Sequence, residues 1–291
     1  MFKGSFVALL TPFKNGEVDK AAFKSFVEWQ IAEGTHGLVP CGTTGESPTL
    51  SHDEHDEVVE LCIEAAAGRV PVVAGAGSNS TAEALRLTKN AKAAGADAAL
   101  IVTPYYNKPT QEGLYRHYAT IAEAVDIPIL IYNIPGRSIV DMSVATMARL
   151  AKIPNIVGVK DASADPTRPM HTSAAIGDDF CQMSGEDATI VPFLAGGGDG
   201  CISVTANIAP RMCSELHTAW QSRDLDTVMA LQKRLMPLHD SMFCEASPGP
   251  VKHAAALLGK CNAETRLPLC EIAEQSKAQV ASAMKSAGLL N

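Results

Sequence analysis

Short apolar segments recur at regular intervals along the first two-thirds of the chain. Each is rich in Val, Ile, Leu and Ala, and each has the length of a buried strand. The segments are roughly residues 5–11, 36–41, 70–76, 98–103, 128–133, 156–160, 180–184 and 200–205. The gaps between them leave room for one helix and two short loops, so the pattern predicts that strands and helices alternate.

The gaps also carry the signals that begin and end helices. Apolar side chains at helical spacing occur at Phe23, Phe26, Val27 and Ile31. Ser51–Glu54 and Ser80–Glu83 both fit a capping box, in which a serine and a glutamate satisfy each other's unpaired backbone N–H groups. Residues 65–68 and 93–95 end in glycine, which is typical of a helix C-terminus. Helices are therefore expected after the first three strands.

Near-continuous apolar strands that alternate with helices are typical of a parallel sheet covered on both faces. Eight such units predict a closed (β/α)8 TIM barrel. From about residue 209 the pattern changes to consecutive helices, which we expect at 225–243 and 268–287. We therefore predict a catalytic barrel over residues 1–224 and a C-terminal α-helical region over residues 225–291.

Composition and charge narrow the classes of function. The chain has 291 residues, of which 46% are hydrophobic and 19% charged, as in a well-packed globular protein. A formal net charge of −8 and the lack of any Lys/Arg-rich run argue against a nucleic-acid partner. Eight scattered cysteines without a CxxC pair are typical of reduced thiols, and no apolar run has the length of a membrane helix. We predict a cytoplasmic protein without a membrane partner.

Lys160 is the first candidate for chemistry, because it ends the apolar run 156–160. Barrel active sites lie where the strands end. Burial lowers the pKa of a lysine, and the neutral amine can attack a carbonyl carbon. Taken alone, such a lysine is more often a surface residue that ends a strand. Lys108 is a rival nucleophile, but it lies between Asn107 and Pro109 with no apolar run to lower its pKa.

Other polar residues follow the expected strand ends. Tyr132 ends the fifth strand and is suited to proton transfer. The Gly42–Gly45 turn offers backbone N–H groups and two threonine hydroxyls to a carboxylate, and Arg137 offers a bidentate fork to a second one. Each also has a structural reading, as a strand-end aromatic, a tight turn and a surface arginine. Together with Lys160 they favour carbonyl chemistry.

Three motifs carry a family resemblance. They are Gly42-Thr43-Thr44-Gly45-Glu46, Tyr132-Asn133-Ile134-Pro135 and Gly158-Val159-Lys160-Asp161. In this order and spacing, the chain resembles over essentially its whole length the pyruvate-dependent class I lyases and aldolases, and within them the dihydrodipicolinate synthases. The resemblance implies that pyruvate forms an imine with Lys160 and that its enamine attacks L-aspartate 4-semialdehyde. The product would be 4-hydroxy-tetrahydrodipicolinate, on the diaminopimelate route to lysine, with no cofactor and no metal.

The resemblance also implies roles for single residues. Thr44, Tyr132 and Tyr106 match the family's proton relay, with Tyr106 entering from a neighbouring subunit of a homotetramer built as a dimer of dimers. The positions that match substrate contacts are Thr43, Thr44, Arg137, Gly185 and Ile202. The last two match positions that contribute main-chain groups.

Six further positions match the site at which lysine-inhibited members bind L-lysine at a subunit interface. They are Ser47, His52, His55, Asn79, Glu83 and Tyr105. The match predicts feedback inhibition by L-lysine. The alternative for His52 and His55, which stand three residues apart at a helix start, is a solvated helix face.

One departure from the family bears on the acceptor substrate. Many members continue after Arg137 with Thr-Gly, whereas this chain has Ser138-Ile139, which retains a hydroxyl but changes the loop. The alternative function is that of an N-acetylneuraminate lyase or keto-deoxy-sugar-acid aldolase, which shares the Schiff-base lysine. A sugar acceptor needs hydroxyl partners rather than Arg137, and the lyases resemble Gly-Ser-Thr-Gly-Glu in the turn. A non-catalytic binder of a keto acid is a third reading, although this chain retains the lysine and the tyrosines.

Overall fold

The computed structural model describes residues 2–291 and contains eight parallel strands that belong to one sheet. The alternation of strands and helices makes the fold a (β/α)8 barrel followed by further helices, as predicted. The chain forms two compact units. The first comprises residues 73–202 with the N-terminal residues up to Lys3, and the second comprises residues 4–72 and 203–291. The predicted division into 1–224 and 225–291 stays a prediction.

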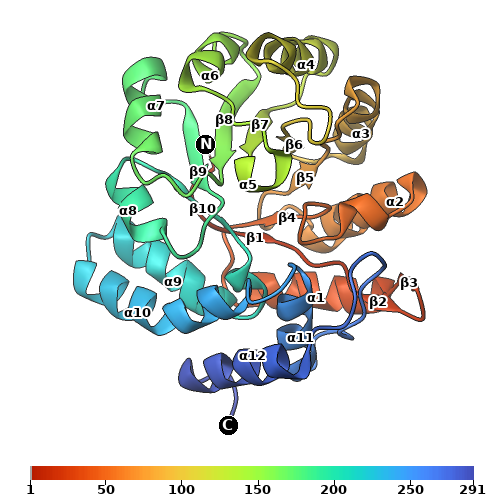
Figure 1. The fold of residues 1–291 in the computed structure, drawn as a ribbon, viewed down its shortest axis with the longest axis vertical. Helices are drawn as coiled ribbons and strands as arrows, with labels where there is room; N and C mark the ends of the chain where they lie inside the picture. The colour runs from red at the N-terminus through yellow and green to blue at the C-terminus, as the bar shows by residue number, and fades with distance from the viewer. Residues whose placement is uncertain (1) are drawn as a thin grey trace. The chain divides into compact units, whose positions relative to one another are not determined.

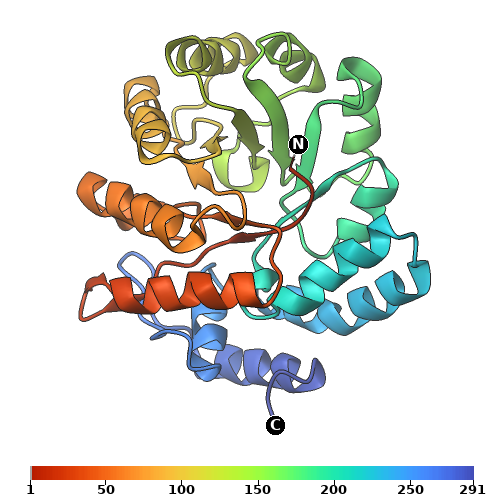
Figure 2. The same ribbon diagram turned by 180° about the vertical axis from the view of Figure 1, so that it is seen from behind.

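Six strands lie in the first unit, hydrogen-bonded in the order β10-β9-β8-β7-β6-β5 (Figure 1). Their bounds are β5 Val73–Gly75, β6 Ala98–Val102, β7 Ile129–Asn133, β8 Ile156–Asp161, β9 Cys181–Ser184 and β10 Gly200–Ser203. The helices of this unit are α3 Thr81–Ala94, α4 Gln111–Ala124, α5 Pro135–Ser138, α6 Val144–Leu150, α7 Arg168–Ile176 and α8 Ile190–Ala195. Both views place α3, α4, α6 and α7 outside the strands (Figures 1 and 2).

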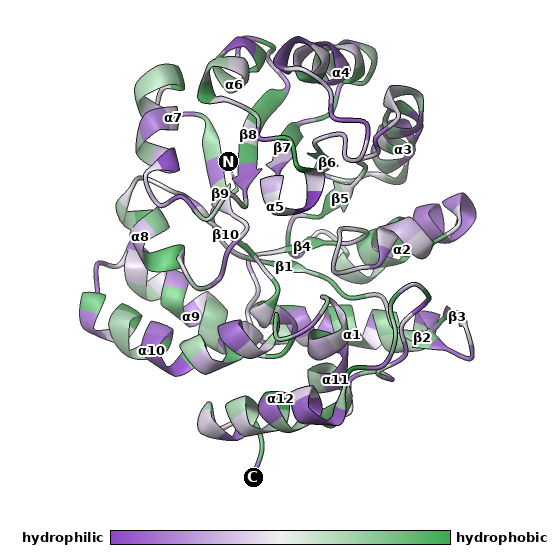
Figure 3. Cartoon of the chain, viewed as in Figure 1, coloured by the Kyte–Doolittle hydropathy of each residue, from purple (hydrophilic) through white to green (hydrophobic). Residues whose placement is uncertain are grey.

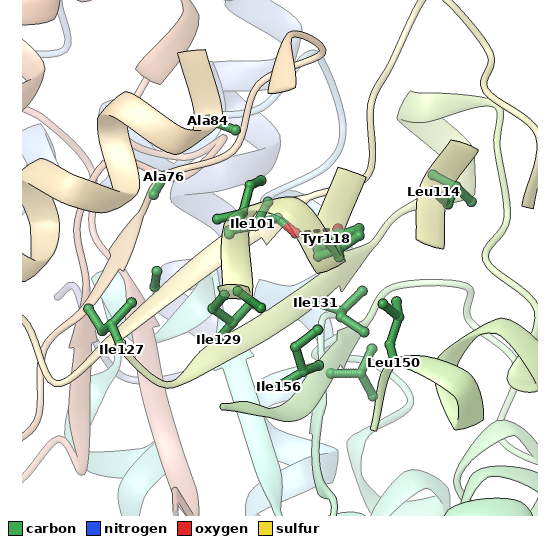
Figure 4. Close-up of a cluster of buried hydrophobic side chains, with 14 of the residues drawn as sticks. Ala76, Ala84, Ile101, Leu114, Tyr118, Ile127, Ile129, Ile131, Leu150 and Ile156 are labelled. Carbon is green, nitrogen blue, oxygen red and sulfur yellow. Dashed lines mark hydrogen bonds between the residues drawn. The ribbon is translucent and has the colours of Figure 1, made fainter. Parts of the chain in front are cut away.

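The core of the first unit lies between these strands and helices α4 and α6 (Figure 4). Ile101, Ile129 and Ile131 come from the strands, and Tyr118 of α4 packs against them with its hydroxyl donating to the Ile101 carbonyl at 2.7 Å. The side chains of this cluster are almost fully buried, and each large aliphatic one contributes about 1.5–3 kcal/mol to folding. This packing holds the ends of β6, β7 and β8 in fixed positions.

The second unit begins with β1 Gly4–Ala8, which pairs in parallel with β4 Gly37–Val39. Its other elements are β2 Phe13–Lys14, β3 Glu17–Val18, α1 Lys20–Ala32, η1 Ser47–Thr49, α2 His52–Ala66, η2 Thr205–Asn207, α9 Pro210–Gln221, α10 Leu225–Ser241, α11 Gly249–Leu257 and α12 Glu274–Ser286. Helix α10 packs against both α9 and α12 (Figure 2). These helices carry both apolar and polar residues, as the two colours of Figure 3 show. Within the described residues, no helix combines the length and apolarity needed to cross a membrane.

The structure confirms most of the expected elements. All eight predicted strands form, each shorter than expected except β8, which extends one residue further to Asp161, and the stripe at Phe23, Phe26 and Val27 is buried. The Ser51 capping box forms, but Ser80, within described residues 2–291, makes no side-chain capping bond. Its expected partner Glu83 is instead hydrogen-bonded by the Ser78 hydroxyl, so the second capping-box prediction is wrong.

The C-terminal helices differ in part from the prediction. The helix expected at 225–243 is α10, whereas the one expected at 268–287 begins at Glu274. Pro268 has no N–H to donate, and the carboxylate of Glu245 accepts the Ala273 N–H at 2.9 Å just before α12. Helix α11 and the β2–β3 hairpin were not predicted. The hairpin had a signal in Asn15-Gly16, whose positive φ angles of 56° and 82° form its turn.

Candidate active site

Lys160 and Tyr132 lie side by side in the first unit because parallel pairing sets them at the same level. Lys160 of β8 is the register partner of Tyr132 of β7. Both residues are 6% exposed, and the Lys160 Nζ lies 4.2 Å from the centroid of the Tyr132 ring. The structure thus brings together, at one end of the strands, the amine predicted to be the nucleophile and the tyrosine predicted to transfer protons.

Gly185 provides the space that the Lys160 side chain occupies. A Cβ atom at Gly185 would lie 3.1 Å from the Lys160 Cε and 2.6 Å from the Ala162 Cβ. The Gly185 N–H donates to the Asp161 carbonyl at 2.7 Å, which continues the sheet beyond the strand. Glycine is therefore required at 185 if the lysine is to reach its present position.

The predicted position Ile202 is fully buried in β10.

A polar network supports the strand ends next to Lys160. The Asn133 amide donates to the carboxylates of Asp141 at 2.8 Å and Asp161 at 3.1 Å, and its oxygen accepts the Met142 N–H at 2.9 Å. The Arg168 guanidinium reaches both carboxylates, at 2.5 Å for Asp141 and 3.6 Å for Asp161. The hydrogen bonds of Asn133 and the ion pairs of Arg168 connect the ends of β7 and β8 where Tyr132 and Lys160 project.

Arg137 lies on the short helix α5, and its side chain is exposed. The next residue, Ser138, is buried. Its hydroxyl accepts from the Thr103 hydroxyl at 3.1 Å and lies 2.9 Å from the Ile134 carbonyl. Ile139 is 65% exposed and has a φ of 66°, a conformation that a β-branched residue adopts only with strain. Ser138 thus anchors the loop from inside, while Arg137 remains available to a ligand.

Glu186 is a carboxyl residue near the site for which the sequence analysis predicted no role. Burial raises the pKa of its carboxyl, the Asp187 carboxylate raises it further, and Lys160 and Arg137 act in the opposite direction. The motif Ser-Gly-Glu after β9 was visible in the sequence, but the proximity of Glu186 to both cations was not.

In the second unit, the predicted carboxylate-binding turn is tightly folded. The N–H groups of Gly45 and Ser47 donate to the Gly42 carbonyl at 3.1 and 3.3 Å, and the Glu46 N–H donates to the Thr43 carbonyl at 3.1 Å. Thr44 is 3% exposed and Thr43 is half-buried. The turn therefore has a backbone closed by its own hydrogen bonds, and the N–H groups of Gly45, Glu46 and Ser47 are used within it.

The two remaining candidates of the β6 loop are exposed. Tyr106 is 90% exposed and has a φ of 71°. Lys108, the rival nucleophile, is also exposed, unlike Lys160. The burial of Lys160 favours it over Lys108 as the nucleophile.

The six positions predicted to bind L-lysine divide between the two units. In the first, the Tyr105 hydroxyl is hydrogen-bonded to the backbone of Asn79, and burial followed by the charge of Glu83 raises its pKa. In the second, Ser47 begins η1, His52 is exposed and His55 is 5% exposed. The structure thus brings Tyr105, Asn79 and Glu83 together, and in the second unit it buries His55 but leaves His52 exposed, so the alternative of a solvated face holds for His52 and not for His55.

A buried charge cluster was also missed. Lys252 of α11, fully buried, forms an ion pair with Glu46, the last residue of the turn motif. A lysine on the apolar face of a helix, beside Val251 and Ala255, was the available signal, but its partner lies some two hundred residues away.

Comparisons with known proteins agree with this geometry. The model of the dihydrodipicolinate synthetase family matches residues 1–287. A 4-hydroxy-tetrahydrodipicolinate synthase from Rhodospirillum centenum is 64% identical over 290 residues, with 100% of both chains covered. A chloride-inhibited dihydrodipicolinate synthase from Acinetobacter baumannii, solved with pyruvate, is 48% identical with a TM-score of 0.97 over 100% of both chains. A dihydrodipicolinate synthase from Cyanidioschyzon merolae with lysine bound is 38% identical, with a TM-score of 0.95 over 99% of both.

The motifs that carry the resemblance lie at the strand end of β8, at the end of β7 and in the turn after β4. The likeness extends over the full length of the chain at high identity. The chain belongs to the dihydrodipicolinate synthetase family.

Proposed function

We propose that this chain is a lyase that condenses pyruvate, held as an imine of Lys160, with L-aspartate 4-semialdehyde to form 4-hydroxy-tetrahydrodipicolinate. The contact of the buried Lys160 amine with Tyr132 at 4.2 Å is the observation that carries the proposal. The amine adds to the C2 carbonyl of pyruvate and water leaves, giving an iminium. Loss of a proton from C3 then gives the enamine, whose carbon attacks the aldehyde. The amino group of the bound semialdehyde then attacks the imine carbon, which closes the ring and displaces the Lys160 amine with the release of 4-hydroxy-tetrahydrodipicolinate.

The other residues have roles that follow from their chemistry. Tyr132, Thr44 and a Tyr106 from a second subunit relay the protons of these steps. Thr43 and Thr44 bind the carboxylate of pyruvate, with main-chain support at Gly185 and Ile202. Arg137 binds the carboxylate of the semialdehyde, for which its exposed guanidinium is suited.

A trapping experiment tests the role of Lys160. Borohydride reduction in the presence of pyruvate should inactivate the protein and add the mass of the reduced adduct to the peptide that contains Lys160. Lys108→Met serves as the matched control and should trap pyruvate as the unchanged protein does. Adduct at another residue, or no adduct, would refute the Schiff-base mechanism.

A substrate comparison separates the proposed function from that of a sugar-acid aldolase. Pyruvate consumption is measured with L-aspartate 4-semialdehyde, N-acetylmannosamine and an aldose-derived aldehyde. Turnover confined to the semialdehyde is expected. The variant Arg137→Met should raise the KM for the semialdehyde much more than the KM for pyruvate. Turnover of a sugar aldehyde would retain Lys160 but remove the role of Arg137.

We also infer that L-lysine inhibits the enzyme. The grouping of Tyr105, Asn79 and Glu83 supports this inference, because a carboxylate and a phenol suit an ammonium group. L-lysine at millimolar concentration should reduce turnover, whereas D-lysine should not. Tyr105→Phe should weaken inhibition, and Tyr115→Phe, on helix α4, serves as its control. Unchanged turnover in L-lysine would contradict the inference.

We further infer a homotetramer in the cytoplasm, in which Tyr106 crosses to a neighbouring site. A tyrosine that is 90% exposed at a positive φ supports this role. Tyr106→Ala and Lys160→Ala should each be inactive alone, but mixed oligomers should recover activity, because one site then combines an intact Lys160 with an intact Tyr106. No recovery on mixing would place Tyr106 outside the neighbouring site.

A further inference from the structure

Glu46 and Lys252 form a buried ion pair in the second unit. Lys252 is fully buried and Glu46 is 1% exposed, and their Nζ and Oε1 atoms lie 2.5 Å apart. The backbone N–H of Arg266 donates to the second carboxylate oxygen of Glu46 at 3.0 Å. Both oxygens of Glu46 are therefore held by residues of the C-terminal segment. We call Glu46, Lys252 and the Arg266 N–H the Glu46 anchor.

The residues of the anchor make further contacts with their surroundings. Lys252 also donates to the Glu264 carbonyl at 2.7 Å and lies 3.9 Å from the centroid of the Phe13 ring. The Arg266 guanidinium contacts the same ring at 4.3 Å and is paired with both oxygens of Glu54. These contacts tie the segment that follows the Thr43–Thr44 turn to the C-terminal segment at more than one point.

Stability alone does not account for a pair of this kind. Removing two charges from water is costly, and a well-packed apolar pair is often as stable. The cost is visible in the direction of the Lys252 pKa, which burial lowers despite the opposing effect of Glu46. Charged pairs do, however, fix the relative geometry of the segments that carry them.

The segment fixed here is the end of the carboxylate-binding turn. Glu46 has a φ of 54° and directly follows Gly45, where a Cβ atom would lie 3.0 Å from the Leu9 carbonyl oxygen. The Gly45 carbonyl in turn accepts from the Thr11 hydroxyl at 2.7 Å. Gly45 and Glu46, the last two residues of the turn, are thus held by packing and by polar contacts, which restricts the backbone that carries Thr43 and Thr44.

We propose that Glu46 is a positioning residue for the Thr43–Thr44 turn, and that the Glu46 anchor sets the affinity for the carboxylate of the donor keto acid. This proposal rests on the assignment of Thr43 and Thr44 to the pyruvate carboxylate made above. The C-terminal segment thereby controls donor binding although its residues do not touch the substrate.

Lys252→Met tests the proposal, because it removes the charge and retains most of the side-chain volume. The KM for pyruvate should rise about tenfold, whereas kcat and the KM for the semialdehyde should change less than about threefold. Borohydride trapping at Lys160 should require correspondingly more pyruvate and reach the same final extent. Lys277→Met, which removes the ion pairs of Lys277 with Glu271 and Glu274 on and before α12, is the matched control and should leave all three constants unchanged.

Two further variants keep the test decisive if Lys252→Met does not fold. Glu46→Gln retains an acceptor for the Arg266 N–H and should raise the pyruvate KM by a smaller factor. The double variant Glu46→Gln with Lys252→Met restores charge balance and should fold while keeping the raised KM. An unchanged pyruvate KM in the folded variants, or an equal rise in Lys277→Met, would overturn the proposal. Failure of the unchanged protein to trap pyruvate would instead refute the proposed function.

Discussion

Lys160 and Lys252 are both buried beside an aromatic ring, yet their surroundings differ in kind. Lys252 has the Glu46 carboxylate and the Glu264 carbonyl as partners. Within described residues 2–291, no carboxylate lies within ion-pair distance of Lys160, whose close contact is the Tyr132 ring. A buried amine whose donors are satisfied is structural, whereas one that lacks such partners keeps its lone pair accessible to a carbonyl carbon once it is neutral.

The comparison shows that burial of a lysine does not by itself identify a nucleophile. The nature of the neighbouring acceptors decides the role. The first unit supports Lys160 indirectly, through Asn133 and Asp161 on the strand ends, while the second unit binds Lys252 directly. The same substitution should therefore affect turnover in the first unit and stability in the second.

The largest difference is expected in turnover. Lys160→Met should lower kcat by roughly 10⁴-fold or more, because the covalent route is lost. Lys252→Met should keep kcat within about threefold of the unchanged protein. Steady-state measurements with pyruvate and the semialdehyde check both values. A comparable loss of kcat in the two variants would erase the distinction between the regions.

The next difference is expected in stability. Lys252→Met leaves the Glu46 carboxylate buried without its cation and should lower the free energy of unfolding by about 3–5 kcal/mol. Lys160→Met leaves no buried carboxylate unpaired and should change it by less than about 1 kcal/mol. Urea unfolding followed by circular dichroism measures both. The double variant Glu46→Gln with Lys252→Met should recover most of the loss, and its failure to do so would mean that packing, not charge, is responsible.

The two units should also differ in their response to acid. Burial lowers the pKa of His117 in the first unit from 6.5 to about 4, so stability should fall as pH decreases from about 6.5 towards 4. The hydrogen bond from Arg266 lowers the pKa of Glu54 in the second unit from 4.5 to about 2, so its contribution is present above pH 4.5 and is lost towards pH 2. His117→Gln should flatten the first range and Glu54→Gln the second, as measured by urea midpoints at successive pH values. If both variants changed the urea midpoints over the same pH range, the two losses of stability could not be assigned to His117 and Glu54.

The smallest effect is expected beside the Lys160 region. Ile139 has a φ of 66°, and Ile139→Gly should raise the free energy of unfolding by about 1 kcal/mol by removing this strain. Ile139→Ala, which keeps a Cβ atom, should raise it less. Thermal unfolding of the three proteins measures the difference. Lower stability in the glycine variant would show that the Ile139 side chain has stabilising contacts that outweigh the strain.

Sequence patterns were sufficient for the elements that depend on neighbouring residues. The eight strands follow from local apolar runs, and the Ser51 capping box follows from two residues three positions apart. The same local logic failed at Ser80, because Ser78 competes for the Glu83 carboxylate. It also placed the start of α12 too early, since the Ala273 N–H just before the helix donates to the carboxylate of the distant Glu245.

The sequence by itself determined the barrel, the position of Lys160 at a strand end and the family motifs, because each depends on residue type and short-range spacing. The tertiary structure alone decided which lysine has a carboxylate partner. Glu46 is separated from Lys252 and Arg266 by about two hundred residues, and no periodicity relates them. The difference between a reactive and a structural lysine therefore lies in contacts that form only when distant segments of the chain pack together.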